Sequence, residues 1–484
     1  MKKHFNLKMV TGLAVLILLP HLLAFAGPNE DLFSACKNGD LGGVESALKA
    51  GADANAVDAS GNSVLANAFF WPEITKLLLS KGADPNGGKY PAIIQAANNY
   101  SIEVMDLLLA AGADPNAPGV ISSPAMKAVY DQIKTLEAQA AGAKGKTKKI
   151  FEDAVANLKA QYGDENSGGI KVYAINQAVQ QSNCAPCIEK LLAKGAKMDL
   201  AAGQPLIHIW ATFAMTAAER KDAFAKGKAA IEGTYGIKTP DWYGNLPSDR
   251  NKESEEILRL LIASGSDVNK LNAQGKTPLH IALSGGIGNK EHVMLALLKN
   301  GADISIEDPE FGKCFTMAAR TGLVEVAKLM VSKGADIGET SKIMDMTQGQ
   351  RLNGATPLIA ATINNHLDMV KYLVAIGASI KEDAEGFSYN IYTGCATGVK
   401  NKSAIYFAVD NRNKDIIKFM VEESGLKWYR PMKINQLKQE FVSQAGNLKI
   451  TTTKCYSDGE YKPSTYAKKM ELKDIAGYLK DHDL

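Results

Sequence analysis

The sequence lacks a strong net charge of either sign. Its 484 residues include 55 Lys and Arg against 52 Asp and Glu. Lys2, Lys3 and Lys8 lie in the segment 1–26, which contains no acid, so the remainder of the chain has equal numbers of basic and acidic residues. A general polyanion binder needs a basic field, and this balance argues against nucleic acid as a partner. With 46% apolar and 22% charged residues, the chain is also too apolar for wholesale disorder.

Catalytic motifs are missing as well. The sequence has only seven histidines and contains no His-Glu-x-x-His pair, no Gly-x-Ser-x-Gly elbow and no phosphate-binding P-loop. The phrases Asp53-Ala54-Asn55 and Asp84-Pro85-Asn86 have calcium-binding residue types, but Asp and Asn are equally typical of turns. We therefore expect no enzyme activity, no metal and no cofactor.

The segment 1–26 has the features of an export signal. The three lysines form a basic leader, Val10 to Leu19 is apolar, and Ala24-Phe25-Ala26 offers the small residues of a signal peptidase site. The alternative is an uncleaved anchor, but the apolar stretch is shorter than the roughly 20 residues of a spanning helix. No other segment is apolar enough to span a bilayer. We expect a signal peptide at 1–26, a periplasmic or secreted location, and no membrane contact after cleavage.

One phrase returns throughout the chain: an apolar helix end followed by Gly-Ala-Asp or a close variant. The spacing of its glycines indicates a basal repeat of about 33 residues with four long insertions. Upstream of each glycine, apolar residues follow a helical period, and the glycine suits the left-handed end of a helix. The glycines lie at positions 51, 82, 112, 195, 265, 301, 334, 377 and 425.

A second phrase marks the start of a shorter helix in each copy. Its fullest form runs from Gly275 to Ala282 (GKTPLHIA), where Thr277 can cap the helix and Pro278 suits its first turn. His280 is expected to bridge backbone groups. These two phrases together resemble the ankyrin repeat, and the resemblance covers most of residues 30–484.

The resemblance implies an all-α, ankyrin-repeat solenoid of stacked helix-turn-helix units with finger loops and helical insertions. It also implies a scaffold that binds a protein partner through finger tips and inner helices, and we expect this scaffold to be a monomer. The expected organisation is a signal peptide at 1–26, N-terminal repeats at 27–116, a helical insertion at 117–171, repeats at 172–426 with an insertion at 217–253, and a loop insertion with a capping repeat at 427–484.

The insertions are the features particular to this chain. Residues 117–171 contain a helical pair at 124–141 and 148–162, expected to pack on the stack as a solvated hairpin; a docking arm is the alternative. Residues 217–253 contain a helix and a loop whose aromatics, Trp242 and Tyr243, either anchor a partner or pack locally. Residues 380–402 and 427–462 enlarge consecutive fingers.

The six cysteines are even in number, which favours disulfides in an oxidising compartment. Cys184 and Cys187 form a Cys-x-x-Cys motif, read either as a structural disulfide or as a thiol-disulfide oxidoreductase site. Cys395 and Cys455 lie in successive enlarged fingers and are the second disulfide candidate. Cys36 is expected to be a buried small residue on an inner helix, and Cys314 to start another inner helix without an evident partner.

The sequence thus predicts an exported, non-enzymatic scaffold for protein–protein interaction, in the manner of an inhibitor, an immunity protein or a stress-protection protein. The alternative is the oxidoreductase that uses Cys184 and Cys187. The candidate partner-binding residues are Asp58, Ser60, Asn62, Lys89, Tyr90, Trp242, Tyr243, Asn272, Gln274 and Lys276.

Overall fold

The structure is a computed structural model. It describes residues 27–121, 124–162, 170–198, 205–235, 238–240, 243, 253–284, 290–345, 350–390, 395–424, 431–436, 459–482 and 484. The expected signal peptide, Trp242 and Cys455 lie outside the described residues. The chain divides into two compact units, Met1–Ala202 with Ala217–Glu253, and Gly203–Thr216 with Ser254–Leu484.

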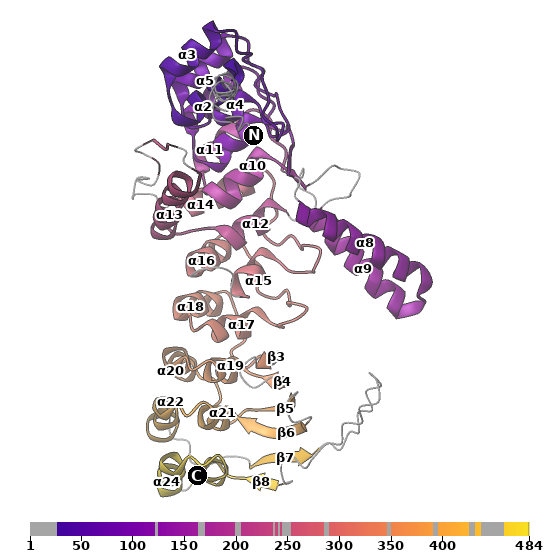
Figure 1. Ribbon diagram of the computed structural model, residues 1–484. Helices are drawn as coiled ribbons and strands as arrows, with labels where there is room; N and C mark the ends of the chain where they lie inside the picture. Colours follow the sequence, from indigo (N-terminus) through magenta and orange to yellow (C-terminus); the bar gives the residue numbers. More distant parts are fainter. Residues whose placement is uncertain are drawn as a thin grey trace, which may run out of the picture. The chain divides into compact units, whose positions relative to one another are not determined.

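The first unit stacks helix pairs, in which an inner helix is followed by an outer helix of nine residues (Figure 1). Neighbouring outer helices contact one another, as do neighbouring inner helices. The pairs are α2 (Pro28–Asn38) with α3 (Leu41–Lys49), α4 (Val64–Asn67) with α5 (Pro72–Ser80), α6 (Ala92–Asn98) with α7 (Ile102–Ala110), and α10 (Ala174–Gln177), continued by the π-helix η3 (Ala178–Ser182), with α11 (Ala185–Ala193).

The second unit repeats the same design. Its outer helices form one column and its inner helices another (Figure 1). The pairs are α12 (Leu206–Phe213) with α14 (Glu253–Ala263), α15 (Pro278–Leu283) with α16 (Glu291–Lys299), α17 (Cys314–Thr321) with α18 (Val324–Ser332), α19 (Pro357–Ile363) with α20 (Leu367–Ala375), α21 (Ala404–Asp410) with α22 (Lys414–Lys418) and its π-helical end η4 (Phe419–Glu423), and α23 (Pro463–Lys469) with α24 (Lys473–Asp481).

The two recurring phrases start and end these helices as expected. The Thr277 hydroxyl accepts a hydrogen bond from the backbone N–H of His280, and His280 Nδ1 accepts one from the Thr277 N–H, which makes a reciprocal cap. His280 Nε2 donates to the carbonyl of Ile306 in the next finger, 3.0 Å away, which confirms its bridging role. After α16 the chain turns at Gly301 with a φ of 91°, a conformation that favours glycine.

Asparagines connect successive fingers through their side chains. Asn86 Nδ2 donates to the carbonyl of Gly112 at 3.1 Å, and Asn86 Oδ1 accepts from the N–H of Asp114 at 2.7 Å. Both partners belong to the next repeat, so one amide bridges two repeats. The same pair of bonds is made by Asn55 to Gly82 and Asp84, by Asn116 to Gly195 and Lys197, and by Asn269 to Gly301 and Asp303.

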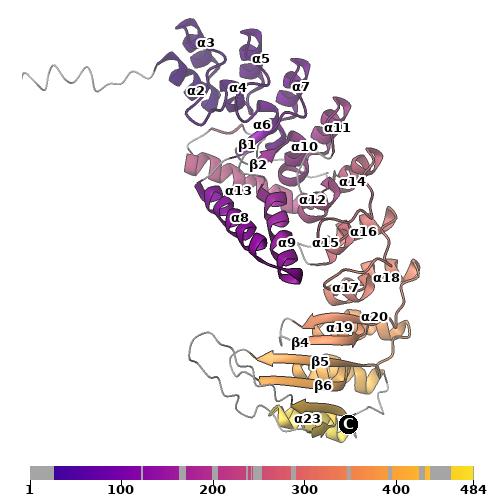
Figure 2. The same ribbon diagram turned by 90° about the vertical axis from the view of Figure 1, so that its right-hand side faces the viewer.

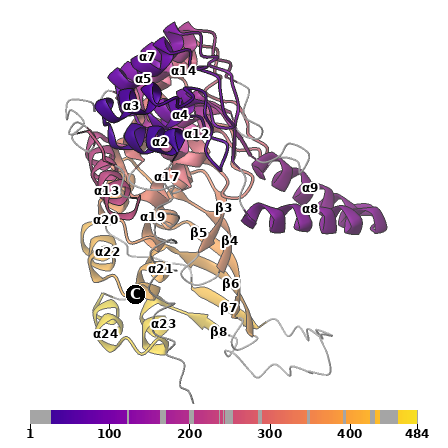
Figure 3. The same ribbon diagram turned by 45° about the horizontal axis from the view of Figure 1, so that its top comes forward.

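Toward the end of the second unit the fingers pair as an antiparallel six-stranded sheet in the order β3-β4-β5-β6-β7-β8 (Figure 3). Ile343 pairs with Leu352, Leu352 with Gly386, and Gly386 with Val399. Cross-strand partners share a face, so this row gives the sheet a buried apolar side. The strands are β3 (Ser341–Asp345), β4 (Gln350–Ala355), β5 (Asp383–Asn390), β6 (Cys395–Ser403), β7 (Met432–Gln436) and β8 (Gly459–Tyr461).

The insertion at 117–171 forms the predicted helical pair, α8 (Pro124–Gly142) and α9 (Gly145–Tyr162). In the sequence this pair is flanked by two short antiparallel strands that pair with each other, β1 (Gly119–Ile121) and β2 (Ile170–Val172). The prediction that it packs on the stack is wrong for the described residues. Its apolar cluster is formed by its own helices, which lie in front of the stack in Figure 2, and it projects beyond the repeats of the first unit (Figures 1 and 3). The members of the cluster are Val129, Tyr130, Ile133, Val155 and Leu158.

Candidate protein-binding surface

The first predicted finger is built by the carboxylate of Asp58. Asp58 Oδ1 accepts hydrogen bonds from the backbone N–H groups of Ser60 and Asn62, both at 2.9 Å. Asn62 Nδ2 approaches the other carboxylate oxygen at 3.4 Å. Asp58 and Asn62 therefore shape the turn, and Ser60 is left exposed at the tip.

The next finger is joined to the first through the backbone of Lys89. Its N–H donates to the carbonyl of Gly61 at 2.8 Å, and its carbonyl accepts from the N–H of Val120 at 3.0 Å. The Lys89 side chain is exposed, whereas Tyr90 is half-buried, and burial raises its pKa to about 12. The Tyr90 phenol is therefore neutral at physiological pH.

In the second unit, two of the predicted binding residues have structural roles. Asn272 is buried, and its Oδ1 accepts from the N–H groups of Gln274 and Lys276 at 3.0 Å each. The Lys276 side chain is 15% exposed and pairs with Asp308 at 3.6 Å and Glu310 at 3.0 Å. The finger uses both groups internally, and a role of Asn272 and Lys276 in partner contact stays a prediction. Gln274 remains exposed.

Two cations hold an aromatic ring between this finger and an inner helix. Lys276 Nζ and the guanidinium carbon of Arg320 each lie 4.8 Å from the centre of the Phe311 ring. Both distances are within the range of cation–π attraction. Phe311 and Arg320 are half-buried, and sequence reasoning missed them because Phe311 follows the turn in a finger that lacks the usual pattern.

Sequence reasoning also missed two exposed apolar residues at finger tips. Val57 is 56% exposed and Leu271 is 49% exposed. Each directly precedes the Asp or Asn that shapes its turn, so they occupy the same position in the repeat. Alignment of the two copies, VDASGN and LNAQGK, gives the signal that could have found them.

Tyr243, the described member of the aromatic pair in the insertion at 217–253, packs locally. Tyr243 is buried, and its ring lies 4.7 Å from that of Phe70 and 5.3 Å from that of Phe224 on α13 (Ala217–Tyr235). Its hydroxyl donates to Asn99 Oδ1 at 3.4 Å, and burial raises its pKa to about 12. Tyr243 is therefore wrong as an exposed partner anchor, because its ring fills a space between α13 and the repeats of its own unit.

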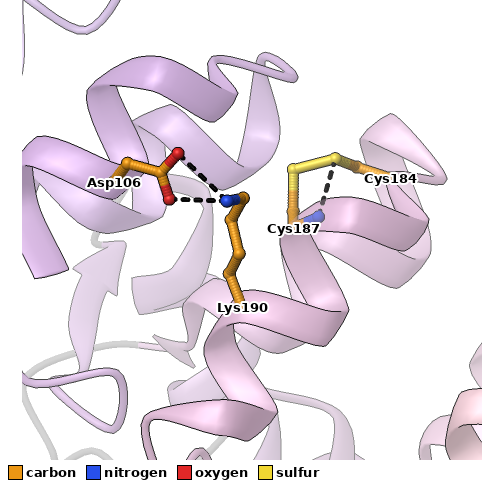
Figure 4. The surroundings of a disulfide bond; sticks show 4 residues. All are labelled: Asp106, Cys184, Cys187 and Lys190. Carbon is orange, nitrogen blue, oxygen red and sulfur yellow. Dashed lines mark hydrogen bonds and ion pairs between the residues drawn. A yellow bond between two sulfur atoms is a disulfide. The ribbon is translucent and has the colours of Figure 1, made fainter.

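Cys184 and Cys187 form a disulfide with Cα atoms 5.2 Å apart. Cys184 caps α11, and its sulfur accepts the backbone N–H of Cys187 (Figure 4). One turn further along α11, Lys190 forms an ion pair with Asp106 of α7 (Figure 4). Neither cysteine has exposed surface, and thiol-disulfide exchange requires access to a sulfur. This geometry supports the structural interpretation.

The other cysteines show no second pair within the part of the chain that the structure describes. Cys36 and Cys314 are buried free thiols, as expected, and burial raises the pKa of Cys36 to about 12. The Cys395–Cys455 disulfide stays a prediction because Cys455 lies outside the described residues. Among the described residues, no group of three His, Cys, Asp or Glu side chains is placed to hold a metal ion. No described helix combines the length and hydropathy needed to cross a membrane.

Comparison with known proteins gives a consistent assignment. A family model for ankyrin repeats (3 copies) matches residues 32–118, 250–341 and 316–431, more than half of the chain. The chain is 28% identical over 131 residues to ankyrin repeat and KH domain-containing protein mask-1 of Caenorhabditis elegans. It is 30% identical over 210 residues to alpha-latrocrustotoxin-Lt1a of Latrodectus tredecimguttatus, and 29% over 126 residues to NF-kappa-B inhibitor alpha of Sus scrofa.

These similarities are partial on both sides. They cover 26%, 42% and 26% of this chain, and 4%, 13% and 38% of the respective relatives. The chain therefore spans well under two thirds of each relative, and the activity of a whole relative does not transfer with the match.

Proposed function

Because the chain belongs to the ankyrin repeat family, generally a non-enzymatic interaction module, we propose that this protein is an exported scaffold that binds another protein and has no catalytic activity. Its helical repeats present fingers and inner helices as one surface in each unit. A balanced charge beyond residue 26 disfavours nucleic acid as the partner. We infer that the scaffold acts as a monomer.

The exposed apolar tips, Val57 and Leu271, carry this proposal. A single exposed apolar residue is ordinary on a protein surface. These two occupy equivalent positions, one in each unit, on turns held by Asp58 and Asn272. A rigid turn lowers the entropic cost of binding, and an apolar side chain at its tip supplies area to bury.

We infer that the biological role is that of an inhibitor, an immunity protein or a stress-protection protein of the cell envelope. NF-kappa-B inhibitor alpha, which matches over part of this chain, is by its name an inhibitor. Such a role needs a binding surface and no catalytic group.

Export is tested by the mass of the protein recovered from the envelope fraction of its native cell. We expect a chain that begins near Gly27, because a short apolar stretch precedes Ala24-Phe25-Ala26. A retained N-terminus would contradict cleavage and favour the membrane anchor.

Binding is tested by capture from the envelope fraction followed by mass spectrometry, with the wild type and two variants as bait. The double substitution Val57→Ser and Leu271→Ser should lower recovery of the partner at least tenfold, because both finger tips lose their apolar contacts. Leu41→Ser is the matched control, since Leu41 is 39% exposed but lies on α3, outside the fingers. Equal recovery with all three baits would contradict the proposed surface.

A further inference from the structure

The hairpin of α8 and α9 is an arm with its own small core. Tyr130 and Ile133 are buried against Val129, Val155 and Leu158, all of which belong to the hairpin. This cluster is toward the base of the arm, next to the β1–β2 ladder. The arm extends beyond the repeats of the first unit (Figures 1 and 3), so its tip is available to another surface.

The tip of the arm is the most basic short segment of its unit. Residues 144–149 contain four lysines and no acid, in a chain that is otherwise balanced in charge. The described side chains of Lys144, Lys148 and Lys149 are exposed. Lys148 pairs with Glu152 at 3.7 Å, whereas Lys144 and Lys149 have no ion-pair partner within the described part of the chain.

Among these lysines the structure shows one ion pair, that of Lys148 with Glu152 one turn along α9. Lys144 directly precedes α9, Lys148 lies in its first turn and Lys149 follows that turn. The helix dipole disfavours positive charge near this end, and the first turn contains no acidic residue. The lysines also repel one another, and an anionic surface would relieve that repulsion.

An apolar side chain stands beside these charges. Ile150 is 65% exposed, more than any other large apolar residue that the structure describes. It follows Lys149 directly, so both side chains are exposed on the same turn of α9, although they point about 100° apart around the helix. Basic residues combined with an exposed aliphatic residue are typical of segments that lie on a membrane surface.

The choice of lysine distinguishes a lipid surface from a protein partner. Protein interfaces are enriched in Arg and aromatic residues and depleted in Lys. Lysine is a compact charge on a flexible stem, without the planar fork that recognises one carboxylate. The segment 144–150 contains no Arg and no aromatic residue. A projecting tip of this kind fits a broad anionic surface better than a shaped pocket.

We propose that the tip of the α8–α9 arm, formed by Lys144, Lys148, Lys149 and Ile150, docks on an anionic lipid surface. The arm holds the scaffold at the membrane peripherally, and the fingers remain free for a protein partner. This contact differs from the expectation of no membrane contact after cleavage. It is independent of the partner-binding surface, because the fingers and the arm tip share no residue.

The test is co-sedimentation of the full chain with two kinds of vesicle, one of phosphatidylcholine alone and one of phosphatidylcholine mixed with phosphatidylglycerol. We expect binding to the anionic vesicles that weakens with added salt. Each lysine near an anionic surface contributes about 1 kcal/mol, or about fivefold in partitioning. The triple substitution of Lys144, Lys148 and Lys149 by Gln should therefore reduce partitioning about 100-fold, and Ile150→Ser should reduce it several-fold.

The matched control replaces Lys37, Lys49 and Lys81 by Gln, which makes the same change in charge at exposed positions of α2, α3 and the end of α5. Residues 1–26 are unchanged in every variant, so differences between variants report on the tip. Equal binding of the wild type and the tip variant would overturn the proposal, as would an equal loss in the control. Loss of heparin binding in the tip variant, with vesicle binding unchanged, would overturn it in favour of an acidic macromolecule.

Discussion

At the scale of single residues, the side-chain amides of asparagines link successive repeats by hydrogen bonds, in addition to the packing of their helices. Each bridging asparagine donates to a carbonyl and accepts from an N–H of the following repeat, so both ends of the amide are used. The donor and acceptor come from the turn after a glycine, where backbone groups lack helical partners. One side chain therefore satisfies two groups that would otherwise depend on water.

We expect Asn86→Ala to lower the free energy of unfolding by about 2 kcal/mol, because two hydrogen bonds between repeats are lost at once. Urea denaturation measures the change, and hydrogen exchange at Gly112 and Asp114 shows where it acts. Ser60→Ala is the control, since the Ser60 side chain is exposed at a finger tip. If Asn86→Ala lowered the free energy of unfolding no more than Ser60→Ala, the Asn86 bridge would not stabilise the contact between the two repeats.

The same residue types were also predicted to bind a partner. Asp58, Asn272 and Lys276 lie in the fingers, and the sequence alone made them candidates. The structure shows their side chains bonded to the turn or to Asp308. Polar side chains at a turn often form hydrogen bonds within the turn itself. Only the structure shows which of them also have free donors or acceptors for a partner.

At the scale of elements, one helix takes its cap from the next repeat. α17 begins after Lys313, which provides no side-chain cap. Glu339, in the following finger, accepts from both the backbone N–H and the hydroxyl of Thr316 at 2.8 Å. This copy has Lys313 and Cys314 where the repeat at 275–282 has Thr277 and Pro278, and the cap comes from a carboxylate distant in sequence.

This cap predicts a dependence on pH. Burial raises the pKa of Glu339 above the ordinary value of 4.5, so the folded state holds the proton more tightly than the unfolded state. Protonated Glu339 therefore adds to the free energy of unfolding. This contribution is fully present below pH 4.5 and is lost as the pH rises through the raised pKa of Glu339. We expect Glu339→Gln to be more stable than the wild type at neutral pH, with the difference disappearing near pH 4.5.

Urea unfolding of both proteins across this range measures the difference. Glu325→Gln is the control, because Glu325 is exposed on α18 and forms a surface ion pair with Lys328. A difference between wild type and Glu339→Gln that does not change with pH would contradict the raised pKa.

The helices could be predicted from the sequence, and the sheet could not. Each helix depends on signals close to it in the chain, such as Thr277 before it and Gly301 after its partner helix. The sheet depends on pairing between successive fingers that a whole helix pair separates in the sequence, as between Arg351 and Phe387. The alternation that marks a strand is weak here because glycines interrupt β5 and β6, so the enlarged fingers were expected only as loops.

At the scale of the whole molecule, two devices hold neighbouring fingers together. Asparagine bridges act at the fingers after Gly51, Gly82, Gly112 and Gly265. At the corresponding positions after Gly301, Gly334 and Gly377 the sequence has Ser305, Gly338 and Lys381. Pairing of β4 with β5 and of β6 with β7 joins the successive fingers from the one after Gly334 onward, whereas the finger after Gly301 contains none of these strands. The chain thus changes from side-chain to backbone links where its fingers lengthen.

Stacking predicts that damage to one repeat spreads to its neighbours. Leu279 on α15 is 1% exposed, and α15 packs against both α12 and α17. Leu279→Ala should lower the free energy of unfolding by about 3 kcal/mol, from lost burial and the cavity that remains. Since each repeat depends on its neighbours for a core, hydrogen-exchange protection should fall in α12 and α17 as well as in α15. Leu271→Ala, at an exposed finger tip, should leave protection unchanged. A loss confined to α15 would show that its neighbours are stable without it, contrary to a stacked array.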